Sequence, residues 1–112
     1  MLIDRDSLGF QMNAWIDALS RRFADVARDR GAPIDAPELD PKVADEVLEL
    51  ARVAAHTRER RFAPLASFMA GIAVERLRRA KPASEVDEAG YIRSVYQSLE
   101  AESEAEAKPA AP

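Results

Sequence analysis

A chain of 112 residues without cysteine is long enough for one hydrophobic core, and it excludes disulfides and thiolate metal sites. Alanine, arginine, leucine and glutamate dominate and glycine occurs four times, so the composition favours helices over sheets. The net charge is −4, but residues 1–81 carry 14 basic and 13 acidic side chains whereas residues 82–112 carry 2 and 7. Because the part before the acidic end is only one charge above neutral, nucleic acid is not the expected partner.

The amino-terminal segment predicts one amphipathic helix. Its first residues, MLIDRDSLGF, carry two aspartates and no long apolar run, unlike a signal peptide or membrane span, so we expect a cytoplasmic protein with no membrane contact. Apolar residues then recur at intervals of three and four, which predicts a helix over residues 8–30. Ser7 is the expected cap at its start, and Gly31 is the expected stop. The apolar stripe comprises Leu8, Met12, Trp15, Ile16, Leu19, Phe23 and Val26.

A proline-rich connector leads to a second expected helix over residues 41–62. The connector ends in Asp40–Pro41, an N-cap followed by proline at the first helical position. One face of this helix is apolar. Charged residues fall together on the opposite face because their separations are multiples of three and four. They are Asp45, Glu49, Arg52, His56, Glu59 and Arg60.

A corner is expected at Ala63–Pro64, because proline lacks a backbone donor and disfavours helical backbone in the residue before it. The next helix, residues 64–80, is apolar nearly all round until Glu75, which predicts the buried central helix of a bundle. Gly71 in its middle costs about 1 kcal/mol relative to alanine, so a close helix crossing is expected there. The expected core includes Trp15, Phe23, Leu50, Phe62, Phe68 and Met69.

The carboxyl-terminal part predicts a fourth helix and a tail. Ser84–Asp87 has the pattern of a capping box before a helix over residues 85–100. Residues 102–112 have no large apolar side chain, so they predict a disordered end or a frayed helical extension. The expected fold is an all-α, compact four-helix bundle with a buried third helix, formed by residues 1–101 as a single domain and followed by the disordered acidic tail.

The candidate site is the arginine-rich corner that contains His56, Arg58, Arg60 and Arg61. Guanidinium groups suit carboxylates and phosphates, so the corner is a candidate contact for a partner or an anion. The competing interpretation is a solvated, salt-bridged helix end. The same two interpretations apply to the basic residues between positions 76 and 81. A lone histidine without an oriented partner or further ligands predicts no catalytic site, no metal site and no bound cofactor, so we expect a non-enzymatic protein.

Several motifs carry a family resemblance: Trp15–Leu19, VLELARVAAH ending at His56, Arg60, Ala63–Leu65, Phe68 and Gly71. Over about residues 12–77 the chain resembles a small helical domain of unknown function that is common in actinobacteria. That domain occurs alone or fused behind a nucleotidyltransferase similar to molybdenum cofactor guanylyltransferase. The resemblance implies an accessory role near molybdopterin-guanine dinucleotide biosynthesis, and it supplies no catalytic residues.

Two functions stay open on this basis. The first is a non-enzymatic accessory domain that binds a protein, such as a nucleotidyltransferase, a molybdoenzyme subunit or a second copy of the chain. The alternative is a small-molecule or nucleotide-phosphate binding module that uses the corner from His56 to Pro64.

Overall fold

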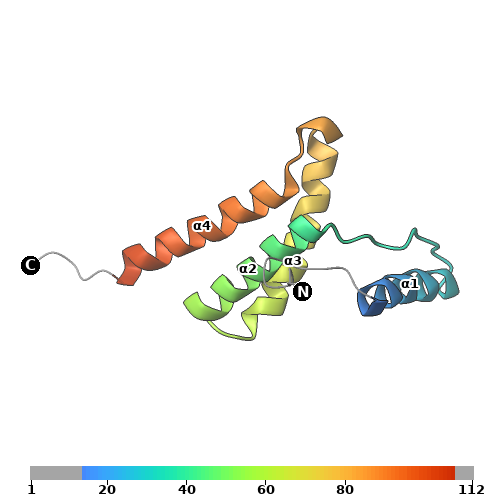
Figure 1. The fold of residues 1–112 in the computed structure, drawn as a ribbon, viewed down its shortest axis with the longest axis horizontal. Coiled ribbons are helices and arrows are strands. Elements are labelled where there is room, and N and C mark those ends of the chain that lie inside the picture. The colour runs from blue at the N-terminus through green and yellow to red at the C-terminus, as the bar shows by residue number, and fades with distance from the viewer. Residues whose placement is uncertain (1–13, 108–112) are drawn as a thin grey trace, which may run out of the picture. The chain divides into compact units, whose positions relative to one another are not determined.

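The computed structural model describes residues 14–107 of the chain (Figure 1). Within that range no strand occurs, so the predicted all-α class is confirmed. Also within that range, no helix combines the length and the apolar character needed to cross a bilayer. The elements are α1 (Ala14–Asp29), α2 (Pro41–Thr57), α3 (Phe62–Ala80), the short 3₁₀ helix η2 (Ala83–Glu85) and α4 (Glu88–Ala107).

The chain divides into two compact units, Met1–Ala44 and Asp45–Pro112, and each is described by itself. The described part of the first unit consists of α1, an exposed connector without regular structure, and the first residues of α2. The Ser20 hydroxyl donates a hydrogen bond to the carbonyl oxygen of Pro37, which ties the connector to α1.

The end of α1 follows the prediction, because Gly31 terminates the helix in a Schellman motif. The N–H of Gly31 donates to the Arg28 carbonyl at 2.9 Å, and the N–H of Ala32 donates to the Ala27 carbonyl at 2.9 Å. Gly31 takes a φ of +81°, a left-handed conformation that favours glycine.

The apolar stripe of α1 is not part of a core. No residue of this helix is buried, and Trp15 and Phe23 are both exposed, so their assignment to the core is wrong. The physical reason within this unit is that residues 31–40 are exposed at every position and leave the stripe uncovered. The predicted helix start at residue 8 and its cap at residue 7 lie outside the described residues.

The start of α2 confirms the predicted cap. The Asp40 carboxylate accepts the N–H groups of Lys42 at 2.7 Å and Val43 at 3.3 Å, and Pro41 is the first helical residue. These hydrogen bonds satisfy donors that have no acceptor inside the helix.

The corner between α2 and α3 lies earlier than predicted, because α3 begins at Phe62 and takes Pro64 into its first turn. A proline is tolerated there, since the first N–H groups of a helix have no acceptor within it. The two N–H groups before it bond to the connector: Phe62 to the Glu59 carbonyl at 3.0 Å, and Ala63 to the Arg60 carbonyl at 3.1 Å. The turn therefore occupies residues 58–61 rather than Ala63–Pro64.

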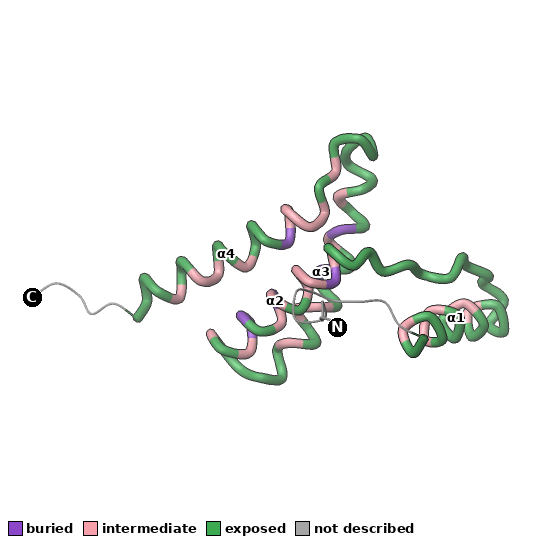
Figure 2. Tube along the Cα trace, in the orientation of Figure 1, coloured by how far each residue is buried: buried purple, intermediate pink, exposed green. Residues whose placement is uncertain are grey.

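The core of the second unit is small and is shared by α2, α3 and α4 (Figure 2). Val53 and Ile92 are the most completely enclosed of its large side chains, at 1% and 2% exposure. The expected burial of Leu50 is confirmed. The buried residues of this unit are Leu50, Val53, Ala54, Ala70, Val74 and Ile92.

The third helix is not the buried centre that its composition predicts. Only Ala70 and Val74 are buried, while Phe68 is 73% exposed. The half-buried and buried positions of α3 are mostly alanine, whereas Leu65, Phe68, Met69 and Ile72 are exposed. Apart from the neighbouring backbone of α3 itself, no described atom lies within 4 Å of the position a Cβ would take at Gly71, so the expected close helix crossing there is wrong for the described residues.

The fourth helix begins and ends later than predicted. Residues 83–85 form η2, and Asp87 rather than Ser84 caps α4, accepting the Gly90 N–H at 3.0 Å. A Cβ at Gly90 would lie 2.2 Å from an Asp87 carboxylate oxygen, so glycine leaves room for this cap. The helix continues to Ala107, so residues 102–107 are helical, and residues 108–112 lie outside the described part.

Candidate functional site

The most prominent surface feature of the second unit is an exposed apolar stripe along α3. Its residues recur at the i, i+3, i+4, i+7 spacing of one helix face and define what we call the α3 stripe: Leu65, Phe68, Met69 and Ile72. Phe68 and Met69 are 73% and 67% exposed, although phenylalanine and methionine are among the residue types most often buried. A cluster of large exposed apolar side chains marks a surface that binds another molecule.

A shallow groove of about 420 Å³ adjoins the carboxyl-terminal end of the α3 stripe. Its lining is mostly apolar and comes from α3 and the first turn of α4: Met69, Ile72, Ala73, Arg76, Leu77, Ala80 and Tyr91. Arg76 has no ion-pair partner among residues 14–107. The stripe and groove together form an apolar surface with Arg76 at its end.

The four residues predicted as the candidate site are distributed over α2 and the turn after it. His56 lies in the last turn of α2, and Arg58, Arg60 and Arg61 lie in the turn. Arg58 pairs with Glu106 at 3.2 Å. The structure therefore gives the corner a carboxylate partner of its own.

Arg61 also has a carboxylate partner. Its Nε lies 2.7 Å from an oxygen of Glu59, and its guanidinium lies 5.9 Å from the centre of the Phe62 ring. His56 and Arg60 are exposed, and within residues 14–107 their side chains have no hydrogen-bond or ion-pair partner. Two of the four candidates are thus neutralised, and two are open to solvent.

The charged face predicted on α2 is salt-bridged around Arg52, whereas Glu59 and Arg60 lie beyond the end of the helix at Thr57. Arg52 Nε donates to Glu49 at 3.0 Å, and a second nitrogen of Arg52 lies 3.5 Å from Glu100 on α4. The hydrogen bond from Arg52 holds the pKa of the Glu49 carboxyl below its usual range. The i, i+3 pair was visible in the sequence, whereas the contact with α4 was not.

A polar cluster that the sequence did not indicate joins α2 to α4. One oxygen of Glu46 accepts hydrogen bonds from Arg93 at 2.6 and 3.1 Å, and the other accepts the Tyr96 hydroxyl at 2.5 Å. The bonds from Arg93 and then Tyr96 lower the pKa of Glu46. The same contact raises the pKa of Tyr96, because its hydroxyl hydrogen is held by a carboxylate.

A second pair missed from the sequence joins α3 to α4. Arg78 binds Glu88 through two nitrogens, with Nη2 lying 3.0 Å from Oε1. Such a fork-to-carboxylate contact is among the stronger side-chain interactions, and it raises the pKa of Arg78. No periodicity links residues on different helices, so only the tertiary structure brings these partners together.

The ion pairs that α2 and the turn after it make with α4 join residues that are a nearly constant number of positions apart. Glu46 and Arg93 are 47 positions apart in the sequence. Arg52 and Glu100 are 48 positions apart, and so are Arg58 and Glu106. Partners that advance together in this way lie on helices that run in the same direction (Figure 1). Cross-helix ion pairs thus recur along most of α4.

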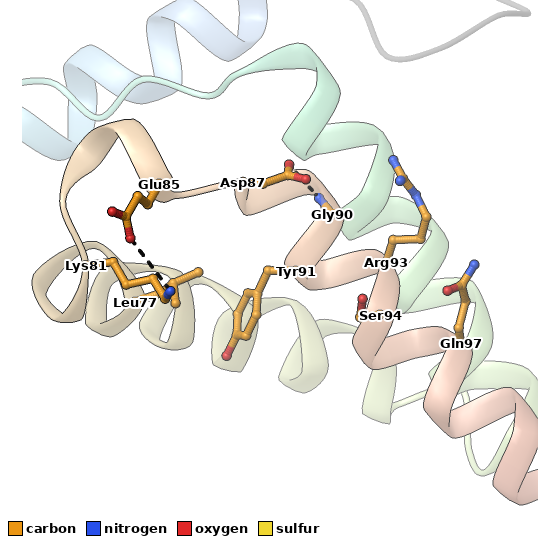
Figure 3. Close-up of a pocket in the computed structure, with 9 residues that line it drawn as sticks. All are labelled: Leu77, Lys81, Glu85, Asp87, Gly90, Tyr91, Arg93, Ser94 and Gln97. Atoms are coloured by element: carbon orange, nitrogen blue, oxygen red, sulfur yellow. Dashed lines mark hydrogen bonds and ion pairs between the residues drawn. The ribbon is translucent and has the colours of Figure 1, made fainter.

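A second, more polar groove of about 460 Å³ lies at the start of α4. Figure 3 shows the residues that line it. Lys81 and Glu85 face each other at its edge at 4.0 Å, and Asp87 is engaged with the Gly90 N–H. Leu77, Tyr91, Arg93, Ser94 and Gln97 complete the lining. Among residues 14–107 no group of three His, Cys, Asp or Glu side chains could hold a metal ion.

One comparison with known proteins identifies a family. A family model described as "Domain of unknown function (DUF6457)" matches residues 9–110. No curated protein and no solved structure shows significant similarity to the chain.

Proposed function

Because this chain belongs to the DUF6457 family, a domain of unknown function, we propose its function from its own surface: a cytoplasmic, non-enzymatic interaction domain that binds a protein partner on the α3 stripe. The observation that carries this proposal is the exposure of Phe68 and its neighbours. Burying one such side chain contributes about 1.5–3 kcal/mol, and four of them lie within two helical turns.

The spacing of the α3 stripe also indicates the kind of partner surface. Side chains at i, i+3, i+4 and i+7 are the anchors by which a helix binds an apolar groove or pairs with another apolar helix face. Arg76, which has no ion-pair partner in the described part of the chain, adds a position beside the groove for a carboxylate of the partner. We therefore propose an apolar helix or groove with an acidic residue at one end as the complementary surface.

The first partners to test come from the family resemblance. Similar domains occur alone or fused behind a nucleotidyltransferase resembling molybdenum cofactor guanylyltransferase. We propose that such a transferase, or a molybdoenzyme subunit, binds the α3 stripe of this chain. This extends the resemblance to an accessory role in bacterial molybdopterin-guanine dinucleotide biosynthesis.

Isothermal titration of the purified chain with such a transferase tests the proposal. Phe68→Asp should weaken binding by a factor of about 30 or more, because a charge at a central apolar anchor removes a hot spot. Leu48→Asp is the matched control, since Leu48 is an exposed apolar residue of the same unit outside the stripe. Equal binding by both variants and the parent would contradict the proposal.

Self-association gives a separate outcome. Sedimentation equilibrium of the parent chain measures whether a second copy occupies the stripe. If the parent forms a dimer that is lost in Phe68→Asp and kept in Leu48→Asp, the occupant of the stripe is a second copy of the chain rather than a transferase. A monomer in all three proteins leaves the heterologous partner as the proposal.

The alternative, a nucleotide-phosphate site at the arginine-rich corner, has less support because Arg58 and Arg61 already contact carboxylates. Replacing Arg60 and Arg61 by glutamine should leave the free energy of unfolding within about 0.5 kcal/mol. Titration with a guanine nucleotide then decides: binding by the parent that disappears in this variant would favour the alternative over the α3 stripe.

A further inference from the structure

The carboxyl-terminal turns of α4 lie on arginine side chains of α2 and of the turn after it. Glu100 is 3.5 Å from Arg52, and Glu106 is 3.2 Å from Arg58. Residues 100–107, EAESEAEA, contain four glutamates, no basic residue and no large apolar side chain, and none of these residues is buried. Two ion pairs therefore join this segment to α2 and to the turn after it.

These ion pairs are exposed and weak. The side chains of Arg58 and Glu106 are 56% and 55% exposed, and those of Arg52 and Glu100 are 50% and 41% exposed. Ion pairs with this exposure contribute little to stability and are screened by salt. An acidic segment held in this way can be displaced by another one without unfolding the core around Val53 and Ile92.

We propose that Arg52, Arg58 and Arg60, the arginine face, form a docking surface for an acidic segment of a partner protein, and that residues 100–107 are a built-in competitor for it. Residues 100–107 demonstrate the chemistry that fits, since carboxylates on an alanine-rich helix already reach two of the three guanidinium groups. Arg60 has no ion-pair partner among residues 14–107 and is available to an incoming carboxylate.

This surface is separate from the α3 stripe. The three arginines lie on α2 and the following turn, whereas the stripe lies on α3. Variants of the arginine face leave Phe68 unchanged, and Phe68→Asp leaves the arginine face unchanged. The two proposals can therefore fail independently.

The test measures the binding of a fluorescein-labelled alanine–glutamate peptide to the whole chain by fluorescence anisotropy at low salt. Replacing Glu100 and Glu106 by glutamine should raise the affinity roughly two- to ten-fold, because two weak competing ion pairs are lost. The matched control replaces Glu102 and Glu104 by glutamine, which changes the net charge equally but removes no cross-helix pair found within residues 14–107. Equal affinities for the two double variants would overturn the competition.

Two further measurements test the docking surface and the displacement separately, without changing residues 100–107. Replacing Arg52 and Arg58 by glutamine should reduce peptide binding at least ten-fold, and unchanged binding would overturn the docking surface. In the parent chain, adding the peptide should speed amide hydrogen exchange in residues 100–107, and no change would overturn the displacement. If a DNA oligonucleotide of equal charge binds more tightly than the peptide, the partner of the arginine face would be nucleic acid rather than an acidic protein segment.

Discussion

Leu50 and Phe68 show two uses of a large apolar side chain within the second unit. Leu50 on α2 is 5% exposed and belongs to the core, whereas Phe68 on α3 is 73% exposed. Burial of apolar surface is what stabilises a fold, so Leu50 contributes to folding and Phe68 contributes to what the surface can bind.

Alanine substitution separates the two roles. Leu50→Ala should lower the free energy of unfolding by about 2–5 kcal/mol, because it leaves a cavity in a small core. Phe68→Ala should change it by less than about 0.5 kcal/mol, since the side chain has few neighbours to lose. Urea unfolding of the two variants measures both values. A loss of several kcal/mol in Phe68→Ala would show that the stripe is covered in the folded chain.

The ionisation of Glu46 is coupled to the fold, because both of its oxygens accept hydrogen bonds from α4. Its pKa is lowered by the hydrogen bonds from Arg93 and then Tyr96. A carboxyl with a lowered pKa in the folded state stabilises the protein above its unfolded-state pKa. That contribution is lost as the pH falls through the lower, folded-state pKa.

The pH dependence of unfolding checks this role. At neutral pH, Glu46→Gln should cost about 1–2 kcal/mol, because a charged acceptor of two donors is replaced. The difference between parent and variant should shrink once the pH falls below about 4.3, the ordinary value for a glutamate. Tyr96→Phe is the control that removes only the hydroxyl and should keep most of the pH dependence. A pH-independent difference would contradict the assignment.

At the scale of the element, the start of α4 depends on one cap. Asp87 accepts the Gly90 N–H, and its own carbonyl accepts the Tyr91 N–H at 2.9 Å. The cap satisfies a helix donor and places a negative charge at the positive end of the helix dipole. The absence of a Cβ at Gly90 leaves the space that the carboxylate occupies.

A double-mutant cycle tests this dependence. Asp87→Ala should cost about 0.5–2 kcal/mol, and Asp87→Asn should cost less because an amide oxygen also caps. Gly90→Ala should be destabilising in the parent, since its Cβ displaces the carboxylate, but stabilising by up to about 1 kcal/mol when Asp87 is already alanine. Thermal unfolding of the four proteins gives the coupling energy. Additive effects would show that the glycine and the cap are independent.

The end of α4 should matter little for folding. Residues 102–107 are helical, but Glu106 holds them through one exposed ion pair with Arg58. Deleting residues 102–112 should shift the melting temperature by less than about 4 °C, because exposed pairs contribute little. Circular dichroism melting measures the shift. A drop of 10 °C or more would show that α4 needs these residues to stay folded.

At the scale of the whole molecule, the second unit combines a small core with ion pairs that join its helices. Its buried side chains include alanines and valines, so α2, α3 and α4 enclose a limited apolar volume. Arg78 with Glu88 and Arg93 with Glu46 fix α4 to the other two helices. The large side chains of α3 remain outside this core, on the surface to which we assign partner binding.

The sequence by itself determined the helical class and the boundaries that depend on local chemistry. Asp40 caps α2 and Gly31 ends α1 as predicted, because each acts on backbone groups within a few residues of itself. The i, i+3 pair of Glu49 and Arg52 was predictable for the same reason. Helical periodicity and capping need no information about the rest of the chain.

Only the tertiary structure decided which side of α3 is buried and which charges meet. A helix that is apolar nearly all round gives no periodic signal for its core side, so Ala70 is buried and Phe68 exposed according to where α2 and α4 pack. The pairs of Arg93 with Glu46 and of Arg58 with Glu106 join residues 47 and 48 positions apart. Such contacts depend on the register between helices, which is set by packing over the whole unit rather than by any local pattern.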